Sequence, residues 1–557
     1  MNDQSRLKFW VVAGGIVFAL AVAGWLARPA YRHFKEQHSA KQAEIFFART
    51  DYRNAFLSVR QALLINSNNV PACRIMARLL DLNQSPAALA WQQRVVDLEL
   101  NITNELMLAS EGLQHQAPPF PLAAQILREL SASATNLVEY QVIATELALR
   151  LNRMADAQAH LEMALQLQPT NRQFQVNLAT LQLGGTNPVI AETGRGELKK
   201  FLADTNFAAQ ALRSLVSDRL LQKDLPAAFN YSTQLTATPQ VTVGDGLQQL
   251  DILRTLHTDF SPQLKFTQQL AATNAAAAAA VASWMVANGR AADAANWLNG
   301  LPPDVQSQLP ARLALVDCYL ANKDWQALMN FTSKGDWRDA EFLRKAFLSH
   351  GLSELGISSA AETDWKAAVE SAGERPGSLV ALADLASRWD LEPEHEDLLW
   401  QIVRKFPKAG NAGKELEQVY FRAGDTRKLN ELYGTLLAAF PQNIEIKNNL
   451  TATSLLLRTN LPQSYIRAKE NYDQKPDDPS VVSTYAYALD LQDRAREGLA
   501  VMEKLEPASL EKPSIALYYG VLLATTGETD KGAHFFQLAQ TQGGLLPEEK
   551  ALIKISH

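Results

Sequence analysis

The chain has very little cysteine, and this scarcity excludes several kinds of site. Its only cysteines are Cys73 and Cys318, and neither has a second cysteine or a histidine at metal-ligand spacing. A structural zinc site and a CxxC redox motif both need such partners. We therefore predict that the two cysteines are buried small hydrophobic residues.

Positive charge is also in short supply. The 557 residues contain 53 Lys and Arg against 59 Asp and Glu, which gives a net charge of −6 with no long basic run. Binding to a phosphate backbone needs the opposite balance, so nucleic acid is not an expected partner. The apolar fraction of 47% is ample for folding, and the length calls for several domains or an array of repeats.

Catalytic motifs are missing as well. The nine histidines are scattered, and no HExxH, GxSxG or Cys/His nucleophile pattern occurs. The stretch GNAGKE (410–415) lacks the spacing of a phosphate-binding loop, and the carboxylates around His395 are expected to form a solvated segment between helices. The prediction is no enzyme, no catalytic residues, no cofactor, no metal site and no small-molecule substrate.

One long apolar run stands out, from Phe9 to Ala27. Its 19 uncharged residues suffice to cross a hydrocarbon core, and Trp10 and Trp25 lie near its ends, where indole rings favour the membrane interface. We predict a single-pass transmembrane helix at 9–27 after a short tail, 1–8. A cleaved signal peptide is the alternative, although the run is longer than usual for one. A buried soluble helix is disfavoured because every face is apolar.

The membrane side of the remaining chain stays open. Lys and Arg number two before the span and four after it, which favours a cytoplasmic C-terminal part. Short positive tails usually stay inside, however, and long domains cross largely regardless of charge. The expectation leans to an inner (cell) membrane protein with an extracytoplasmic, periplasmic domain.

A 34-residue pattern repeats through the rest of the sequence. The units Glu36–Asn69, Val138–Asn171 and Gly410–Asn443 align without gaps, and the prolines Pro169 and Pro441 fall at the same place. Helical patterning at this period is typical of stacked helix–turn–helix units.

The pattern resembles the tetratricopeptide repeat (TPR) family. That family places small residues where two paired helices cross and proline after the second helix, because bulky side chains do not fit at the crossing and proline ends a helix. Residues at the small positions include Ala43, Ala55, Ala62, Ala157, Ala164, Ala282, Ala294, Ala361, Ala368, Gly520 and Gly532, and residues at the bulky ones include Tyr420, Tyr433, Trp365 and Phe536. Leu429 departs from the pattern at a small position.

The resemblance covers about two-thirds of residues 36–546 and implies an all-α fold, a TPR-type α-solenoid of stacked antiparallel helix pairs. The stretches 116–122, 184–196 and 236–246 are rich in Gly and Pro and are expected to be loops at soft joints. The expected organisation is an N-terminal TPR segment (28–183), degenerate middle repeats (197–300) and a C-terminal TPR segment (301–557).

A solenoid of this kind implies a groove lined by the first helix of each unit. The candidate residues at groove positions are Arg74, Arg78, Lys414, Gln418, Arg422 and Asn448. Charged groups in such rows can hold acidic or C-terminal peptide groups, whereas an ordinary solvated helix face would look the same in sequence. The chain shows no match to the Lys/Asn clamp of chaperone-binding TPR domains.

The resulting functional hypothesis is a non-catalytic, membrane-tethered scaffold or adaptor that binds a protein or peptide partner. The resemblance implies bacterial envelope assembly, secretion or export. The alternative is a structural, self-assembling subunit of a larger envelope complex, in which the ends of the solenoid matter more than its groove.

Overall fold

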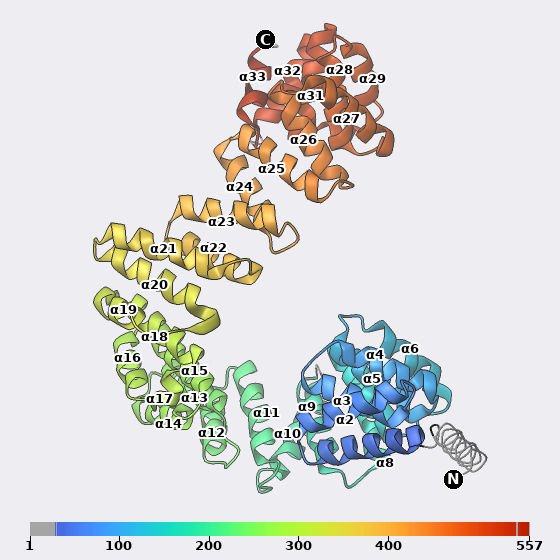
Figure 1. Cartoon of the computed structure of the whole chain (residues 1–557), viewed down its shortest axis with the longest axis vertical. Coiled ribbons are helices and arrows are strands. Elements are labelled where there is room, and N and C mark those ends of the chain that lie inside the picture. The colour runs from blue at the N-terminus through green and yellow to red at the C-terminus, as the bar shows by residue number, and fades with distance from the viewer. Residues whose placement is uncertain (1–27, 29–30, 186, 542–543, 556–557) are drawn as a thin grey trace, which may run out of the picture. The chain divides into compact units, whose positions relative to one another are not determined.

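The structure is a computed structural model, and it describes residues 28, 31–185, 187–541 and 544–555 (Figure 1). Every regular element in these ranges is a helix. The predicted tail 1–8 and transmembrane helix 9–27 lie outside the described residues. Among the helices that are described, none combines the length and apolar character needed to span a bilayer.

The chain divides into two compact units, Met1–Ala272 and Thr273–His557. The first unit opens with a helix over residues 31–48, and helices then follow one another as antiparallel pairs. Its helices are α2 (Tyr52–Ile65), α3 (Val70–Leu82), α4 (Ala87–Leu98), α5 (Ile102–His115), α6 (Pro121–Glu129), the 3₁₀ turn η1 (Leu130–Ala132), α7 (Val138–Arg150), α8 (Met154–Leu167), α9 (Arg172–Leu183), α10 (Pro188–Lys200), α11 (Ala208–Leu221), α12 (Leu225–Thr236), α13 (Val243–Thr255) and α14 (Ser261–Ala271).

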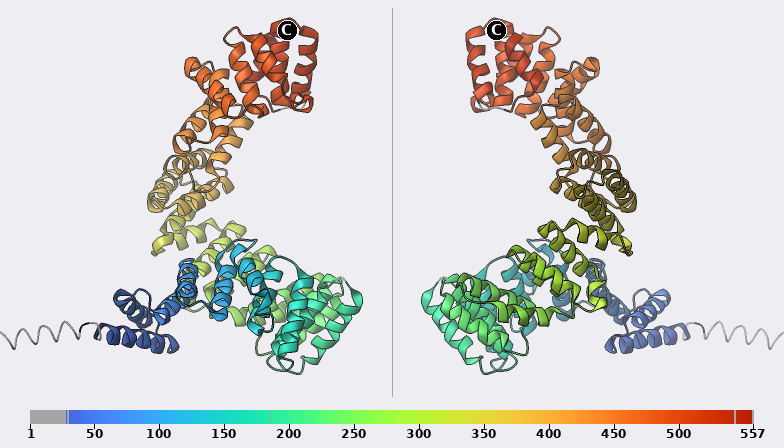
Figure 2. Two further views of the ribbon diagram at one scale, coloured as in Figure 1. Left: turned by 90° about the vertical axis from the view of Figure 1, so that its right-hand side faces the viewer. Right: turned by 90° about the vertical axis from the view of Figure 1, so that its left-hand side faces the viewer.

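The second unit continues with the same kind of helix pair, as the side views also show (Figure 2). Its helices are α15 (Ala275–Ala287), α16 (Ala291–Asn299), α17 (Pro303–Gln306), α18 (Leu309–Asn322), α19 (Trp325–Thr332), η2 (Arg338–Ala340), α20 (Glu341–Glu354), α21 (Ser358–Ala372), α22 (Pro376–Arg388), α23 (Glu392–Lys405), α24 (Ala412–Ala423), α25 (Thr426–Ala439), α26 (Ile444–Leu456), α27 (Leu461–Gln474), α28 (Pro479–Asp490), α29 (Ala495–Met502), α30 (Pro507–Leu510), α31 (Pro513–Thr526), α32 (Thr529–Thr541) and α33 (Pro547–Ile555).

The helix pairs keep the predicted period. From α3 onward, the first helices of successive pairs start 32 to 36 residues apart, for example at Val70, Ile102 and Val138. The spacing persists through residues 197–300, so the repeats there are degenerate in sequence while the helix pairs remain regular. The TPR-type pattern read from the sequence is confirmed as a helix-pair fold.

Small residues lie at the helix crossings, as the repeat pattern predicts. Ala157 and Ala164 on α8 are completely buried, and Ala282 on α15 is too. A Cβ atom added to Gly520 on α31 would lie 2.9 Å from the Phe536 ring of α32, so only hydrogen fits there. Leu429, the departure from the pattern, is accommodated as a buried core residue of α25.

Recurring local signals fix the ends of the helices. Asparagine side chains cap the first helices of several pairs: Asn69 accepts from the Ala72 amide at 2.9 Å, and Asn443 accepts from the Ile446 amide at 3.1 Å. Such caps satisfy amides that have no partner within the helix. Most of the turns between paired helices contain a left-handed residue, for which Gly424 is well suited at φ 67°.

One predicted joint is wrong. Residues 184–196 were expected to be a loop, but all except the first few belong to α10. Asn187 caps the helix with its side chain, and Pro188 fits the first turn because its missing N–H would be unpaired there anyway. Gly194 is a packing residue: an added Cβ would lie 2.6 Å from the Ala179 carbonyl oxygen of α9. In 236–246 only 237–242 is loop, and 116–122 mainly connects α5 to α6 within one pair.

The core is built mainly from these repeated contacts, and both cysteines lie in it as expected, since Cys73 and Cys318 are buried. At the C-terminus, α33 folds back onto earlier helices of the second unit. The Tyr518 hydroxyl of α31 donates to Glu549 at 2.8 Å, and Thr426 at the start of α25 bonds to Glu548. The final helix therefore closes the end of the second unit.

Candidate functional site

A groove runs along the exposed side of three first helices in the first unit, α3, α5 and α7. It consists of two adjoining hollows of about 690 and 580 Å³, and both are lined by Thr103 and Met107 of α5. We call it the α5 groove and define it by Arg74, Thr103, Met107, Ser110, Glu139 and Val142. The location agrees with the groove expected of a TPR-type array.

The middle of the α5 groove is apolar. Met107 and Val142 have 44% and 40% of their surface exposed, although both are hydrophobic. Leu106 and Ile143 line the same hollow and are buried. Apolar side chains exposed side by side in a concave site are typical of a binding surface, because covering them removes unfavourable contact with water.

The Arg74 end of the α5 groove is polar and held in place by hydrogen bonds. The Arg74 guanidinium donates to Glu99 at 3.2 Å and to the Asn104 side-chain oxygen at 3.3 Å. Asn104 is itself buried and donates to the Glu99 backbone carbonyl at 2.7 Å. Arg74 is thus oriented by its neighbours, and about a third of its side chain remains open to solvent.

Arg78 lies one turn further along α3 and is exposed. Its guanidinium carbon is 5.0 Å from the centre of the Phe47 ring, which is a cation–π contact with the helix over residues 31–48. Glu139 supplies the opposite charge at the α7 end of the groove. Arg78 lines neither hollow, so the groove has an apolar centre between Arg74, which is paired with Glu99, at one end and Glu139 at the other.

The other predicted row lies in the second unit. Lys414, Gln418 and Arg422 are all exposed on α24 at four-residue spacing, so they share one face as expected. Val419 and Phe421 on the same helix are exposed too. This face has basic and apolar groups, but it is not among the hollows described above.

Asn448 does not extend that face, which corrects the prediction. It is only 4% exposed, and its side-chain nitrogen donates to the Ser480 carbonyl of α28 at 3.2 Å. The start of the next pair covers this position of α26, so Asn448 joins neighbouring repeats and does not face solvent.

One cluster in the first unit has the residue types of a metal site. Asp81 of α3 and Glu111 and His115 of α5 have ligand atoms within 4.8 Å of one another. His115 Nε2 lies 3.2 Å from Asp81 and 3.4 Å from Glu111. Burial raises the pKa of Glu111, the Asp81 carboxylate raises it further, and His115 opposes both. The His115–Asp81 contact joins α3 to α5, and the His115–Glu111 contact lies within α5.

His395 is also partnered, contrary to the expected solvated segment. Residues from Glu392 onward form the first turns of α23, and His395 is buried with Nε2 3.1 Å from Glu415 of α24. The acidic residues Glu392 and Glu394 lie in the first helical turn, where the helix dipole favours negative charge. These two acidic residues therefore stabilise the start of α23 and do not form a ligand site.

Arg74 is predicted by the sequence pattern, whereas the apolar centre of the groove is not. The signal was present: Val142 and Arg74 both occupy the fifth position of their 34-residue units, and Arg74 is one of the predicted groove residues. Val142 is an apolar residue at a groove position, and such a residue indicates a surface from which a bound partner would exclude water.

No family model matches the chain, and no curated protein matches it. Solved structures similar to it include Pseudomonas aeruginosa PilF (15% identity, 40% of this chain and 99% of that one, TM-score 0.32), the Naa15/Naa10 complex bound to HypK-THB (14%, 93% and 77%, 0.31) and the APC/C hetero-tetramer Cut9–Hcn1 (10%, 82% and 96%, 0.26).

These neighbours are TPR-repeat proteins. Their identities and TM-scores are low, so they carry no functional argument. The assignment rests on the chain's own features: helix pairs at a 32 to 36 residue spacing, small residues at the crossings and capped, left-handed turns. The chain is an array of TPR-type helix pairs.

Proposed function

We propose that the chain is a protein-binding scaffold, and that the α5 groove receives a segment of a partner protein through an apolar side chain. The observation that carries this proposal is the exposure of Met107 and Val142 next to each other in a concave site. Burying an apolar side chain between them is favourable by about 25 cal/mol per Å² of apolar surface covered. The charged ends, Arg74 and Glu139, would set the direction of the bound segment.

The proposal includes a membrane tether and an envelope role. Support for the tether is the apolar run 9–27 in the sequence, and the lean to the extracytoplasmic side comes from its short positive tail. A tether raises the local concentration of a partner at the bilayer. Protease digestion of cells with an intact inner membrane tests the side: digestion of the helical part supports it, whereas protection that detergent reverses contradicts it.

Peptide selection on the full chain tests the groove directly. Peptides from a displayed random library should share an apolar anchor and should lose most of their affinity for a Met107→Glu variant. Met163→Glu is the matched control, because Met163 is exposed to a similar extent but lies on α8, which contributes nothing to either hollow. Selected peptides that bind both variants and the unmodified chain equally would show that the groove is not the site.

A further inference from the structure

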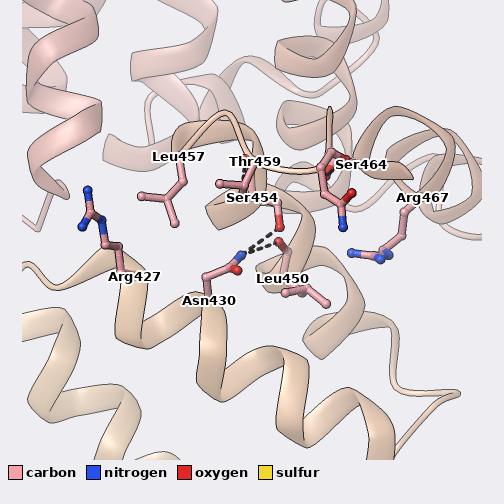
Figure 3. A pocket seen from close by; sticks show the side chains of 9 residues that line it. Arg427, Asn430, Leu450, Ser454, Leu457, Thr459, Ser464 and Arg467 are labelled. Carbon is pink, nitrogen blue, oxygen red and sulfur yellow. Dashed lines mark hydrogen bonds between the residues drawn. The ribbon is translucent and has the colours of Figure 1, made fainter. Parts of the chain in front are cut away.

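A separate hollow, in the second unit, has a different chemistry. It has a volume of about 590 Å³ and lies among α25, α26 and α27 (Figure 3). Its polar lining includes Arg427, Asn430, Ser454, Thr459, Ser464 and Arg467, and none of the residues that line it is acidic. Figure 3 shows Arg427 and Arg467 towards opposite ends, with Asn430 and Ser454 between them.

The two arginines lack the ion-pair partners that several other arginines of the chain have. Arg195 and Arg213 of the first unit each bind an aspartate at 2.8 Å. Among the carboxylates that the structure describes, none forms an ion pair with Arg427 or Arg467. Two cations that face one hollow repel each other, so an anion between them would be attracted by both.

The charge of Arg467 is energetically unfavourable for a second reason, because its side chain is half-buried. Burial lowers the pKa of its guanidinium, and the field of Glu470 on the same helix opposes this shift without cancelling it. A charge removed from water without a partner is unfavourable. An anionic ligand would supply the missing partner and offset that cost.

The other lining groups favour a ligand rich in acceptor atoms. A guanidinium has five N–H donors and no acceptor. The Asn430 amide donates to the Ser454 hydroxyl oxygen at 2.8 Å, which holds two polar side chains together on the wall of the hollow. Thr459 and Asn460 border the start of the 14-residue helix α27, whose positive dipole end also favours negative charge.

We propose that this hollow is a binding site for a small anion with two negatively charged oxygen groups, one directed at each arginine. Phosphate and carboxylate groups share this chemistry, since both accept paired hydrogen bonds from a guanidinium. The site is independent of the α5 groove.

Calorimetric titration of the full chain, in mild detergent, with inorganic pyrophosphate and with citrate tests the proposal. At least one should bind more tightly than inorganic phosphate or chloride at matched ionic strength, and the stronger one identifies the oxygen chemistry. Arg467→Gln should weaken binding by about tenfold or more, because each charge-assisted bond is worth at least one such factor. Arg404→Gln is the charge-matched control, since Arg404 is exposed on α23 and bound to Glu431.

Arg427→Gln guards against a folding defect in the Arg467 variant, because Arg427 is exposed and its replacement leaves the core intact. It should weaken binding as well, with an unchanged melting curve. Failure of both pyrophosphate and citrate to bind above the chloride level would overturn the proposal. Equal affinities for the unmodified chain and both hollow variants would overturn it too.

Discussion

Gly498→Ala probes whether the helix crossings are as tight as the repeat pattern requires. A Cβ atom at this position of α29 would lie 2.7 Å from the Ala486 carbonyl oxygen of α28 and 2.9 Å from a Leu522 methyl group. The methyl group can move, but the carbonyl belongs to a helix backbone. The helix α29 must therefore shift away from α28, and overpacking of this kind typically costs about 1–3 kcal/mol.

Alanine also gains about 1 kcal/mol over glycine in a helix. The two terms leave a net loss of about 0–2 kcal/mol for Gly498→Ala, and the contact with backbone favours the upper part of that range. Gly434→Ala on α25 is the matched control: its Cβ would meet only a Leu450 methyl carbon, at 4.0 Å, so it should stabilise by about 0.5–1 kcal/mol.

Hydrogen exchange of the α28 and α29 amides, with urea unfolding alongside, measures both effects. Exchange in these helices should become faster in Gly498→Ala, whereas in Gly434→Ala the amides of α25 should become more protected. Equal stabilisation by the two substitutions would refute the assignment of close crossings.

Three further predictions concern turns, polar networks and pH. Thr50 has a left-handed φ of 60°, so Thr50→Gly should increase the free energy of unfolding by about 1 kcal/mol and raise the thermal midpoint. Gly356 has a φ of 79°, so Gly356→Ala should decrease the free energy of unfolding by a similar amount and lower the midpoint. Midpoint shifts of the same sign would contradict the turn geometry. Tyr420→Phe removes the acceptor of the Trp400 indole N–H, which lies 2.7 Å away, and should cost about 1–3 kcal/mol in urea unfolding; a cost near zero would contradict this. Burial lowers the pKa of His350 below its ordinary 6.5, so the stability that neutral His350 contributes is fully present above pH 6.5 and declines as the pH falls through the lower folded pKa. The melting temperature should therefore drop less between pH 7 and 5 in His350→Phe than in the unmodified chain. Parallel pH profiles of the two proteins would contradict this.

The repeat could be predicted from the sequence because its determinants are local and periodic. Ala157 and Ala164 are seven residues apart on one face of a helix. Because a helix crossing tolerates only small side chains, alanine or glycine recurs at these positions and can be recognised in the sequence. Gly194 was misread for the converse reason. Glycine signals a loop by composition, and only the position of the neighbouring helix shows that this glycine is a contact residue.

The candidate site was predictable only in part. The repeat frame placed Arg74 at a groove position, and the structure puts it beside a hollow. The same frame failed for Asn448, because burial there depends on the start of α28. The hollow with Arg427 and Arg467 could not be predicted from the sequence. The two arginines are forty residues apart, and only the folded structure shows that they line one hollow and that no described carboxylate pairs with either.

The most direct test of the central claim is photo-crosslinking in cells, with a photoreactive amino acid at position 107 and, as a control, at position 163. Position 107 should form a discrete adduct with a partner protein, and the adduct should disappear when Val142→Glu is added. No such adduct should form at position 163 on α8. Equal labelling at both positions, or labelling at 107 that Val142→Glu leaves unchanged, would contradict the assignment of the α5 groove as the partner-binding surface.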